Sequence, residues 1–374
     1  MTPLEWLRCD VARSYGLDKA TWQERIDWSY QNHELMPGAK EPFLYKSAWE
    51  ALQATLRGEP IDHLISLDAT ASGIQCLSLM SQDSQSALAV NLGTNEVRNP
   101  YRTVKEHMGN YDYERVKKAL MTSFYESVAT PQQLFGDDYD KFVAAAQKML
   151  PGPWAMKEAI ASCMTFKDQY RWTMMDGYEV VMDVTTPVEC SMDIGQGHMM
   201  SWIEHRKAPV ATKGLTANVT HSLDALVLRE VLRRTNTSYA WVEETPFEEL
   251  REKDIVLLQS ILRWQRTKFV TFEVLDHVDN FNQHLVPQEL RDAIDSRASC
   301  EEMYIQPIHD CYRVRATDAT KLFQIVREVM VDLAYAKTAE WLLPQLGYVG
   351  KVNDSEERRS ALKAQVLQSS YLIC

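Results

Sequence analysis

The spacing of apolar residues divides the chain mostly into amphipathic helices, with a few short β-like runs between them. Residues 61–67 form an apolar run rich in Ile and Leu, which predicts a buried strand, and Asp68 follows it directly. A turn of small residues extends from Ala69 to Gly73, and apolar residues then recur at helical spacing through Met80. The pattern predicts a strand, a tight turn and a helix, with a carboxylate at the junction.

A second acid stands at another predicted strand boundary. Residues 303–314 have the pattern of two short strands that meet at His309-Asp310. Open α/β sheets bind ligands at strand ends, and carboxylate oxygens suit Mg²⁺. Asp68 considered alone could equally well serve only as the N-cap of the helix that follows it. Two acids at strand boundaries favour a shared divalent-metal site.

A helix is expected over residues 113–127, with one apolar stripe formed by Val116, Leu120, Phe124 and Val128. Lys117 and Lys118 lie near its start, and Tyr125 lies near its end. Lys118 and Tyr125 are two turns apart and are expected to nearly align. A cation and a phenol on one face could span a nucleotide from phosphate to sugar. The alternative is a helix with solvated lysines and a half-buried tyrosine.

Capping and turn signals locate several other elements. The Thr21-x-x-Glu24 capping box opens a helix from Trp22 to Gln31. Asp176-Gly177 between β-prone runs predicts a hairpin, and residues 187–209 suggest either a further hairpin or an extended loop.

Three later segments follow. An amphipathic helix is expected over 218–234, with His221 in its first turn. The charged residues 235–302 suggest inserted helices, and a long helix is expected from Asp318 to about Leu342. The apolar tail that ends at Cys374 is expected to dock on the protein.

Composition and charge narrow the class of protein. The chain has 374 residues, of which 45% are hydrophobic, and it contains no apolar run long enough to span a membrane. The first residues include Glu5, Arg8 and Asp10, which is unlike a signal peptide. The seven cysteines form no CxxC pair, which argues against zinc and disulfide frameworks and fits a reducing cytoplasm.

The net charge of −12 argues against a protein that wraps nucleic acid without help, because phosphate contacts require Lys and Arg. Basic clusters do occur at 115–118, 229–234 and 263–268. The alternative for each is a solvated helix face, which is the commoner meaning of a charge cluster. A nucleic-acid enzyme with this charge would need these clusters, a partner chain, or both.

Several motifs in order resemble the single-subunit phage and mitochondrial type of DNA-dependent RNA polymerase. Asp68-x-x-x-Ser72-Gly-Ile-Gln75 resembles its motif A, and the segment from Lys117 to Tyr125 resembles its motif B. His221-Ser-x-Asp224 and His309-Asp310 look like its His-Ser-x-Asp element and its motif C. The segment from Gly16 through Lys19 to Asn32-His33 resembles the part of the palm before motif A.

The resemblance implies a fold and a set of domains. The expected class is α/β (α+β): a right-hand polymerase palm and fingers, mostly helical with a small antiparallel palm sheet, lacking the N-terminal domain and the thumb. The expected parts are a palm-adjacent helical segment (1–58), palm with motif A (59–112), fingers with motif B and a hairpin like the specificity loop (113–215), the His-Ser-x-Asp helix (216–234), an insertion (235–302), and palm with motif C and C-terminal helices (303–374).

The resemblance also implies roles for individual residues. Asp68 and Asp310 would hold two Mg²⁺ ions, with the carbonyl of Ala69 as a further ligand. Lys117 would contact the triphosphate, helped by Lys19. The other candidate residues of the substrate site are Lys118, Ser72, Tyr125 and His221, of which the last two would sense the ribose 2′-hydroxyl.

The sequence departs from the family pattern in two ways. Tyr113 stands where the family has an Arg, with Arg115 the nearest arginine, and Glu126 stands where a Gly is usual. The Asp-x-x-Gly-Arg element and the regions before it are absent. The chain therefore looks like the catalytic subunit of a split, podovirus-type polymerase in the cytoplasm of an infected bacterial host. A second subunit would supply the thumb, the N-terminal region and that element.

The expected ligands are NTPs, a DNA template and an RNA product, with an accessory single-stranded-DNA-binding or promoter-opening factor and no membrane. Other readings are a right-hand DNA polymerase, an inactive scaffold subunit and a two-metal phosphohydrolase. Ser72-Gly-Ile-Gln lacks the acidic gate against ribonucleotides that the DNA polymerases carry. A scaffold would not need both acids with Lys117, and a phosphohydrolase would not need the Lys–Tyr helix.

Overall fold

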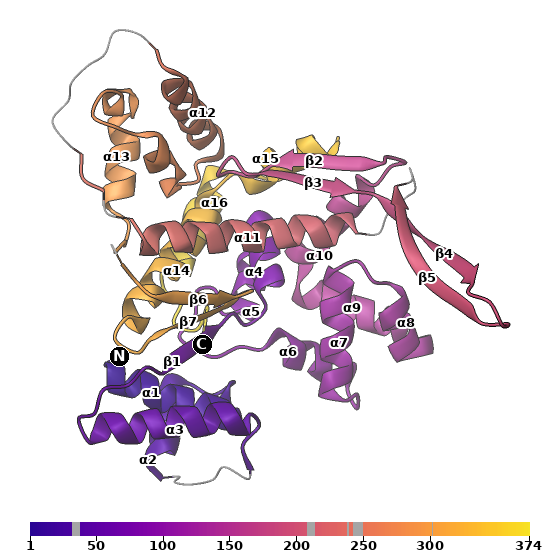
Figure 1. The fold of residues 1–374 in the computed structure, drawn as a ribbon, viewed down its shortest axis with the longest axis horizontal. Helices are drawn as coiled ribbons and strands as arrows, with labels where there is room; N and C mark the ends of the chain where they lie inside the picture. Colours follow the sequence, from indigo (N-terminus) through magenta and orange to yellow (C-terminus); the bar gives the residue numbers. More distant parts are fainter. Residues whose placement is uncertain (32–37, 208–213, 238, 242–249, 301) are drawn as a thin grey trace.

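The computed structural model of the protein describes residues 1–374 except 32–37, 208–213, 238, 242–249 and 301. The Asn32-His33 pair therefore lies outside the described residues. Helices dominate the rest, and the strands form three small antiparallel sheets. Figure 1 shows a long helix, α11 (Leu215–Thr235), crossing the middle of the molecule beside the three-stranded sheet. The assignment of these parts to a palm and fingers stays a prediction.

The three-stranded sheet joins two distant parts of the chain. Its strand order is β1 (Leu64–Asp68), β7 (Cys311–Arg315) and β6 (Ile305–Ile308), all antiparallel. Ile65, Leu67, Tyr312 and Val314 are buried, which matches the alternation that a sheet with one covered face requires. The predicted strand at 61–67 and the strand pair at 303–314 are confirmed.

The N-terminal helices pack beside β1. They are α1 (Pro3–Ala12), a π-helical turn at Arg13–Leu17, α2 (Trp22–Gln31) and α3 (Pro42–Leu56). The capping box at the start of α2 is confirmed, because Thr21 Oγ1 accepts from the Glu24 amide and Glu24 accepts from the Thr21 amide. The buried Asp10 accepts a hydrogen bond from the Ser66 amide at 3.3 Å and so ties α1 to β1.

Three helices form the core above the sheet. They are α4 (Ser72–Met80), α11 and α14 (Ala319–Tyr335), and each contacts the other two. Their facing side chains include Leu77, Leu226 and Val329, which are fully buried. This packing holds the helix that follows Asp68 against the helix that carries His221.

A group of shorter helices follows α4. They are α5 (Ser84–Ala89), α6 (Pro100–Met108), α7 (Tyr113–Phe124), α8 (Ala129–Phe135), a 3-10 turn at Gly136–Asp138, α9 (Tyr139–Met149) and α10 (Pro151–Ser162). The helix expected over 113–127 is confirmed as α7, and its predicted stripe is buried at Val116, Leu120 and Phe124. Val128 is exposed, because α7 ends at Phe124 and the chain turns there.

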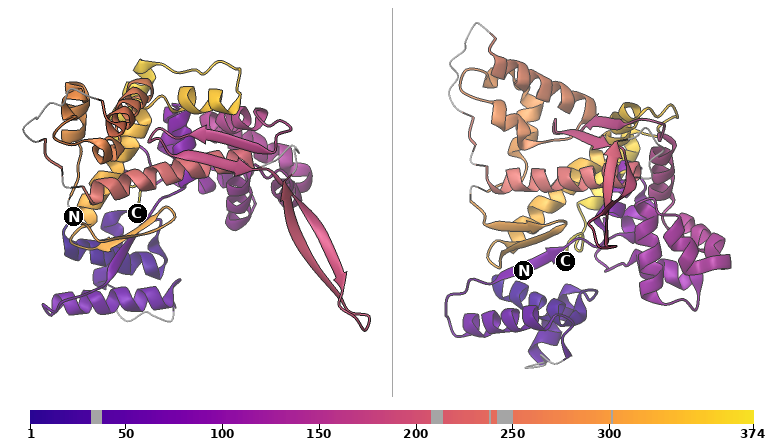
Figure 2. Two further views of the ribbon diagram at one scale, coloured as in Figure 1. Left: turned by 45° about the horizontal axis from the view of Figure 1, so that its top comes forward. Right: turned by 45° about the vertical axis from the view of Figure 1, so that its right-hand side comes forward.

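Two β-hairpins come next. One consists of β2 (Gln169–Thr173) and β3 (Glu179–Asp183), with Asp176-Gly177 in its turn as predicted. The other consists of β4 (Thr185–Asp193) and β5 (Met199–Lys207), which settles the open choice between a hairpin and a loop. This second hairpin projects away from the rest of the protein in Figure 1 and in the left view of Figure 2.

The predicted insertion has its own small core. It contains α12 (Glu252–Thr267), 3-10 turns at Phe272–His277 and Gln283–Leu285, and α13 (Gln288–Asp295). Leu257, Trp264, Phe272 and Leu290 are among the side chains of a buried apolar cluster separate from the main one. The fully buried Arg234 of α11 links this part to α14, because it donates to the Val270 carbonyl at 3.0 Å and pairs with Asp332 at 2.8 Å.

The C-terminal region corrects one expectation. The long helix predicted from Asp318 to Leu342 is two helices, α14 and α15 (Thr338–Leu346), followed by α16 (Glu356–Val366). Ala336 is extended (φ −69°, ψ 150°), and the Lys337 amide donates to Thr267 instead of continuing the helix. The final residues are buried against the core, as expected for an apolar tail. None of the described helices is both long and apolar enough to cross a membrane.

Candidate active site

Strand pairing brings the two predicted acids to the same end of the sheet. Asp68 is the last residue of β1 and lies opposite Cys311, the first residue of β7. Asp310 precedes Cys311 in the tight turn from β6, where His309 takes a left-handed φ of 55°. The Ala69 amide donates to the Asp310 carbonyl at 3.3 Å. The acids are therefore held together by backbone geometry and not by flexible loops.

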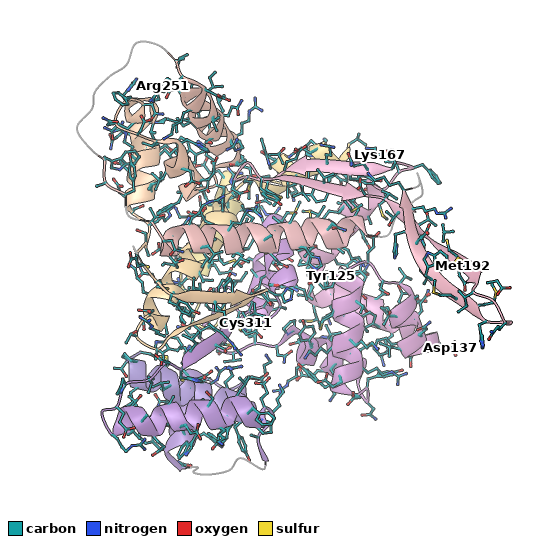
Figure 3. All side chains as sticks on the ribbon, viewed as in Figure 1. Tyr125, Asp137, Lys167, Met192, Arg251 and Cys311 are labelled. Atoms are coloured by element: carbon teal, nitrogen blue, oxygen red, sulfur yellow. The ribbon has the colours of Figure 1, made fainter. Side chains whose placement is uncertain are left out.

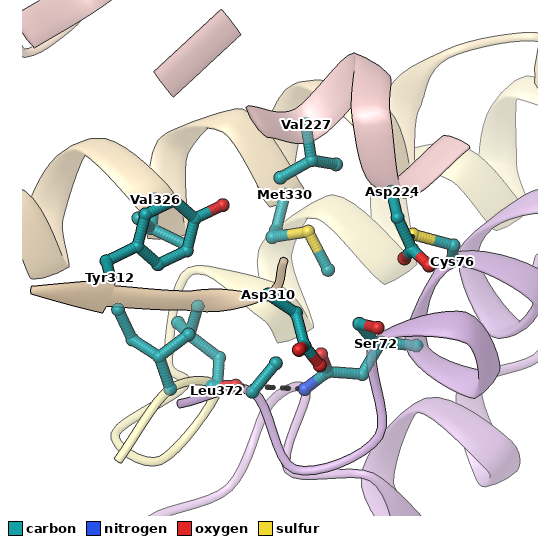
Figure 4. A pocket seen from close by; sticks show the side chains of 12 residues that line it. Ser72, Cys76, Asp224, Val227, Asp310, Tyr312, Val326, Met330 and Leu372 are labelled. Atoms are coloured by element: carbon teal, nitrogen blue, oxygen red, sulfur yellow. Dashed lines mark hydrogen bonds between the residues drawn. The ribbon is translucent and has the colours of Figure 1, made fainter. Parts of the chain in front are cut away.

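The C-terminal segment supports this end of the sheet. The Cys374 amide donates to the Asp68 carbonyl at 2.8 Å, next to a bridge between Ala69 and Ile373. Gln75 Nε2 donates to the Leu372 carbonyl at 3.0 Å, drawn as a dashed line in Figure 4. This buried amide fixes the segment that packs behind Asp68.

Three carboxylates share this region, and their charges repel. Burial, and then the nearby charge of Asp310, raise the pKa of Asp68 to about 6. Burial and Asp310 likewise raise the pKa of Asp224 to about 7, against the opposing effect of hydrogen bonds with Cys76 and Ser72. Figure 4 shows Asp224, Asp310 and Ser72 approaching one another from α11, the β6–β7 turn and α4. A bound cation would relieve the repulsion.

The donor set fits Mg²⁺ that is completed by a substrate. Within the described residues, no three or more His, Cys, Asp or Glu side chains gather closely enough to hold a metal ion by themselves. Mg²⁺ is usually bound through one or two carboxylates together with substrate phosphates and water. Asp68 and Asp310, with the carbonyl of Ala69 beside them, match that pattern.

A cavity of about 310 Å³ lies in front of the acids. Its lining includes the acids Asp68 and Asp310 together with Lys117 and Tyr125 of the region around α7. Lys19 and Lys40 also line it, and of these two lysines only Lys19 was predicted from the sequence as a site residue. Cations and carboxylates thus face each other across a space open to a phosphorylated ligand.

Lys118 is the one predicted site residue that lines none of the described cavities around the acids. It is exposed, whereas Tyr125 is half-buried and lines two of the cavities; the expected near-alignment of the two residues along the helix stays a prediction. The buried side chains of Val116 and Leu120 set the rotation of α7, so that Lys117 faces the cavity and Lys118, about 100° further round, faces solvent. Tyr125 lies just past the last residue of the helix.

Tyr125 and His221 form the opposite wall of the site. Their rings lie 5.0 Å apart, and both residues line a cavity of about 530 Å³ that also contacts Ser72 and Asp310. Figure 3 shows Tyr125 where α7 meets α11. Burial, followed by Asp224 and Asp310, raises the pKa of Tyr125 to about 12, so its hydroxyl stays protonated. His221 is in the second turn of α11 and not the first, because the helix begins at Leu215.

Asp224 is a site residue to which sequence reasoning assigned no role. It lines the 530 Å³ cavity and also a small interior cavity of about 30 Å³ behind the acids. The Cys76 thiol donates to its carboxylate at 3.5 Å. Its position three residues after His221 was the available signal, because residues three apart share one helix face.

Comparison with known proteins gives one distant match. A protein of Neurospora crassa named a probable DNA-directed RNA polymerase is 32% identical to the chain over 173 residues. The match covers 37% of this chain and 19% of the relative, so the chain spans about a fifth of that relative's length. No family model matches the sequence. The chain has a distant relationship to an RNA polymerase.

Proposed function

We propose that the protein is the catalytic subunit of a DNA-dependent RNA polymerase, which extends an RNA 3′ end with NTPs on a DNA template. The observation that carries the proposal is the cavity that joins Asp68 and Asp310 to Lys117 and Tyr125. The relationship to a protein named a probable DNA-directed RNA polymerase supports the same reaction.

In the proposed reaction the RNA 3′-oxygen attacks the α-phosphorus of the NTP. A new P–O bond forms, the bond to the β-phosphate breaks, pyrophosphate leaves, and the 3′-hydroxyl proton passes to solvent. Asp68, Asp310 and the carbonyl of Ala69 would hold two Mg²⁺ ions. When bound, such ions stabilise the charge on the attacking and leaving oxygens.

The remaining side chains would bind and orient the nucleotide. Lys117 and Lys19 would neutralise the triphosphate, since both line the cavity in front of the acids. The Tyr125 hydroxyl, kept protonated by its environment, would meet the ribose together with His221. A hydrogen bond made only by a ribonucleotide would favour NTPs over dNTPs.

We further propose that a second polypeptide completes the enzyme. The net charge of −12 supports this, because a template and product need cations that this chain does not supply in excess. The partner would supply further cations for the template and the product. The insertion around α12 and α13 is a candidate contact for it or for an accessory factor.

Primer extension on an RNA–DNA scaffold tests the proposal. The chain would be assayed with Mg²⁺ and NTPs or dNTPs, alone and with a co-expressed neighbouring polypeptide. We expect NTP-dependent extension that Asp310→Asn abolishes and that Asp62→Asn, at an exposed acid outside the site, leaves intact. Full activity of Asp310→Asn would refute the metal-site assignment. Extension with dNTPs in place of NTPs would favour the DNA polymerase alternative.

A further inference from the structure

A basic cavity adjoins the proposed active site. It has a volume of about 250 Å³ and shares Lys19 with the cavity in front of the acids. Its lining also includes Arg98 and Arg102, with Glu106 as its one acid. Three of its lining side chains are thus cations and one is an acid, in a protein whose net charge is −12. Such a site favours an anionic ligand.

The cations of this cavity are available to a ligand. Arg98 pairs with Glu96 at 3.3 Å and Lys19 with Asp18 at 3.5 Å, and both pairs are solvent-accessible. Exposed pairs of this kind are weak, so a phosphate can compete for the cations. The Arg102 guanidinium has no hydrogen bond or ion pair with any residue that the structure describes.

The helix that carries Arg102 is fixed relative to the active site. Asn99 caps α6 by accepting from the amides of Tyr101 at 3.0 Å and Arg102 at 3.2 Å. The Asn99 side-chain amide also donates to the Tyr113 hydroxyl at 3.0 Å. Tyr113 lines the active-site cavity and occupies the position where the resembled polymerases have an Arg. The Asn99 side chain thus links Tyr113 to α6, the helix that carries Arg102.

We propose that Arg102, with Lys19 and Arg98, binds the polyphosphate of the reaction: the β- and γ-phosphates of the incoming NTP and the pyrophosphate that leaves. Arg102 supplies the cation that Tyr113 does not. A guanidinium suits this task because its fork of N–H groups matches two phosphate oxygens. This inference rests on the proposed function and adds a binding site for the leaving group.

The test is the extension assay with three variants. Arg102→Gln is expected to raise the KM for NTP and the inhibition constant of pyrophosphate by about tenfold each, the usual scale for losing a charge-assisted hydrogen bond. Arg102→Lys should recover part of the loss. Lys105→Gln, on the same helix but outside the cavity lining, is the matched control and should change neither.

The two phosphate sources are separated by the two readouts. A rise in the KM for NTP alone assigns the site to the substrate, and a rise in the pyrophosphate constant alone assigns it to the product. Unchanged values for both overturn the proposal. Weaker scaffold binding with a smaller salt dependence, at unchanged NTP and pyrophosphate constants, would also overturn it and indicate a nucleic-acid backbone contact.

A binding measurement keeps this proposal distinct from the proposed function. If the wild-type chain with its partner extends no primer, the polymerase assignment fails. Calorimetric titration of the full chain with inorganic tripolyphosphate then tests the basic cavity directly. Arg102→Gln should bind about tenfold more weakly than wild type and Lys105→Gln equally well. Equal binding by all three would refute the cavity as a polyphosphate site.

Discussion

We predict that replacing Gly73 by alanine destabilises the protein, because α4 approaches two other elements closely at this position. A Cβ at this position would lie 2.9 Å from Thr220 Cγ2 on α11 and 3.2 Å from the Tyr125 hydroxyl. The first contact is shorter than real Cβ contacts allow, so Gly73→Ala must displace the Thr220 side chain or shift α4 against α11. The glycine is helical, so the need for it comes from space and not from backbone conformation.

The magnitude follows from two opposing effects. Ala in place of Gly stabilises a helix by about 1 kcal/mol. Overpacking a filled core costs about 1–3 kcal/mol. We therefore expect Gly73→Ala to lower the free energy of unfolding by about 1 kcal/mol. It should also displace the Tyr125 hydroxyl by a few tenths of an ångström and reduce the preference for NTP over dNTP by about threefold.

A double-mutant cycle isolates the cause. Thr220→Ser removes the methyl group that the new Cβ would meet and keeps the hydroxyl. In that background Gly73→Ala should cost nothing or stabilise, which gives a coupling of about 1–2 kcal/mol between the two positions. Urea unfolding of the four proteins measures it. An equal effect of Gly73→Ala in both backgrounds would refute the steric argument.

Three further predictions follow from burial and charge. Because its pKa is raised to about 7, Asp224 destabilises the metal-free protein above pH 7, and this loss is relieved as the pH falls and is absent below about 4. In urea unfolding, Asp224→Asn should therefore reduce the change in the free energy of unfolding between pH 5.5 and 8 by about 1–2 kcal/mol, with Asp68 responsible for part of what remains; an unchanged pH dependence would contradict the reasoning. Tyr125→Phe should lower discrimination against dNTPs by about tenfold or more in competitive extension, whereas unchanged selectivity would remove its hydroxyl from sugar recognition. Arg234→Met should destabilise the protein by about 3–5 kcal/mol, because it leaves Asp332 with one ion pair fewer in a buried network. The control Arg57→Met, at an exposed ion pair, should cost less than about 0.5 kcal/mol, and equal shifts of the melting temperature in the two variants would contradict the prediction.

Local elements of the candidate site were readable from the sequence because short-range chemistry determines them. The apolar run before Asp68, the small-residue turn after it and the capping box at Thr21 all act within a few residues. The hairpin at Asp176-Gly177 follows from a turn that needs a left-handed Gly. The motif resemblance added the prediction that some of these elements serve one reaction.

Two features that the sequence did not reveal have a different origin. The break in the predicted helix at Ala336 depends on a hydrogen bond from Lys337 to Thr267, which lies in another part of the chain. The outward direction of Lys118 depends on which face of α7 the core buries. Thr267 and the core that covers α7 are both distant in the sequence from the residues concerned, so periodicity alone did not reveal either feature.

The sequence by itself determined the strand ends that carry Asp68 and Asp310 and the helix that carries Lys117. Only the tertiary structure decided that these ends meet, through antiparallel pairing of β1 with β7. It also decided that Asp224 joins them and that the helix bearing Arg102 borders their cavity. The physical reason is that local propensity acts over a few residues, whereas repulsion between buried acids and the packing of distant helices exist only once the chain has folded.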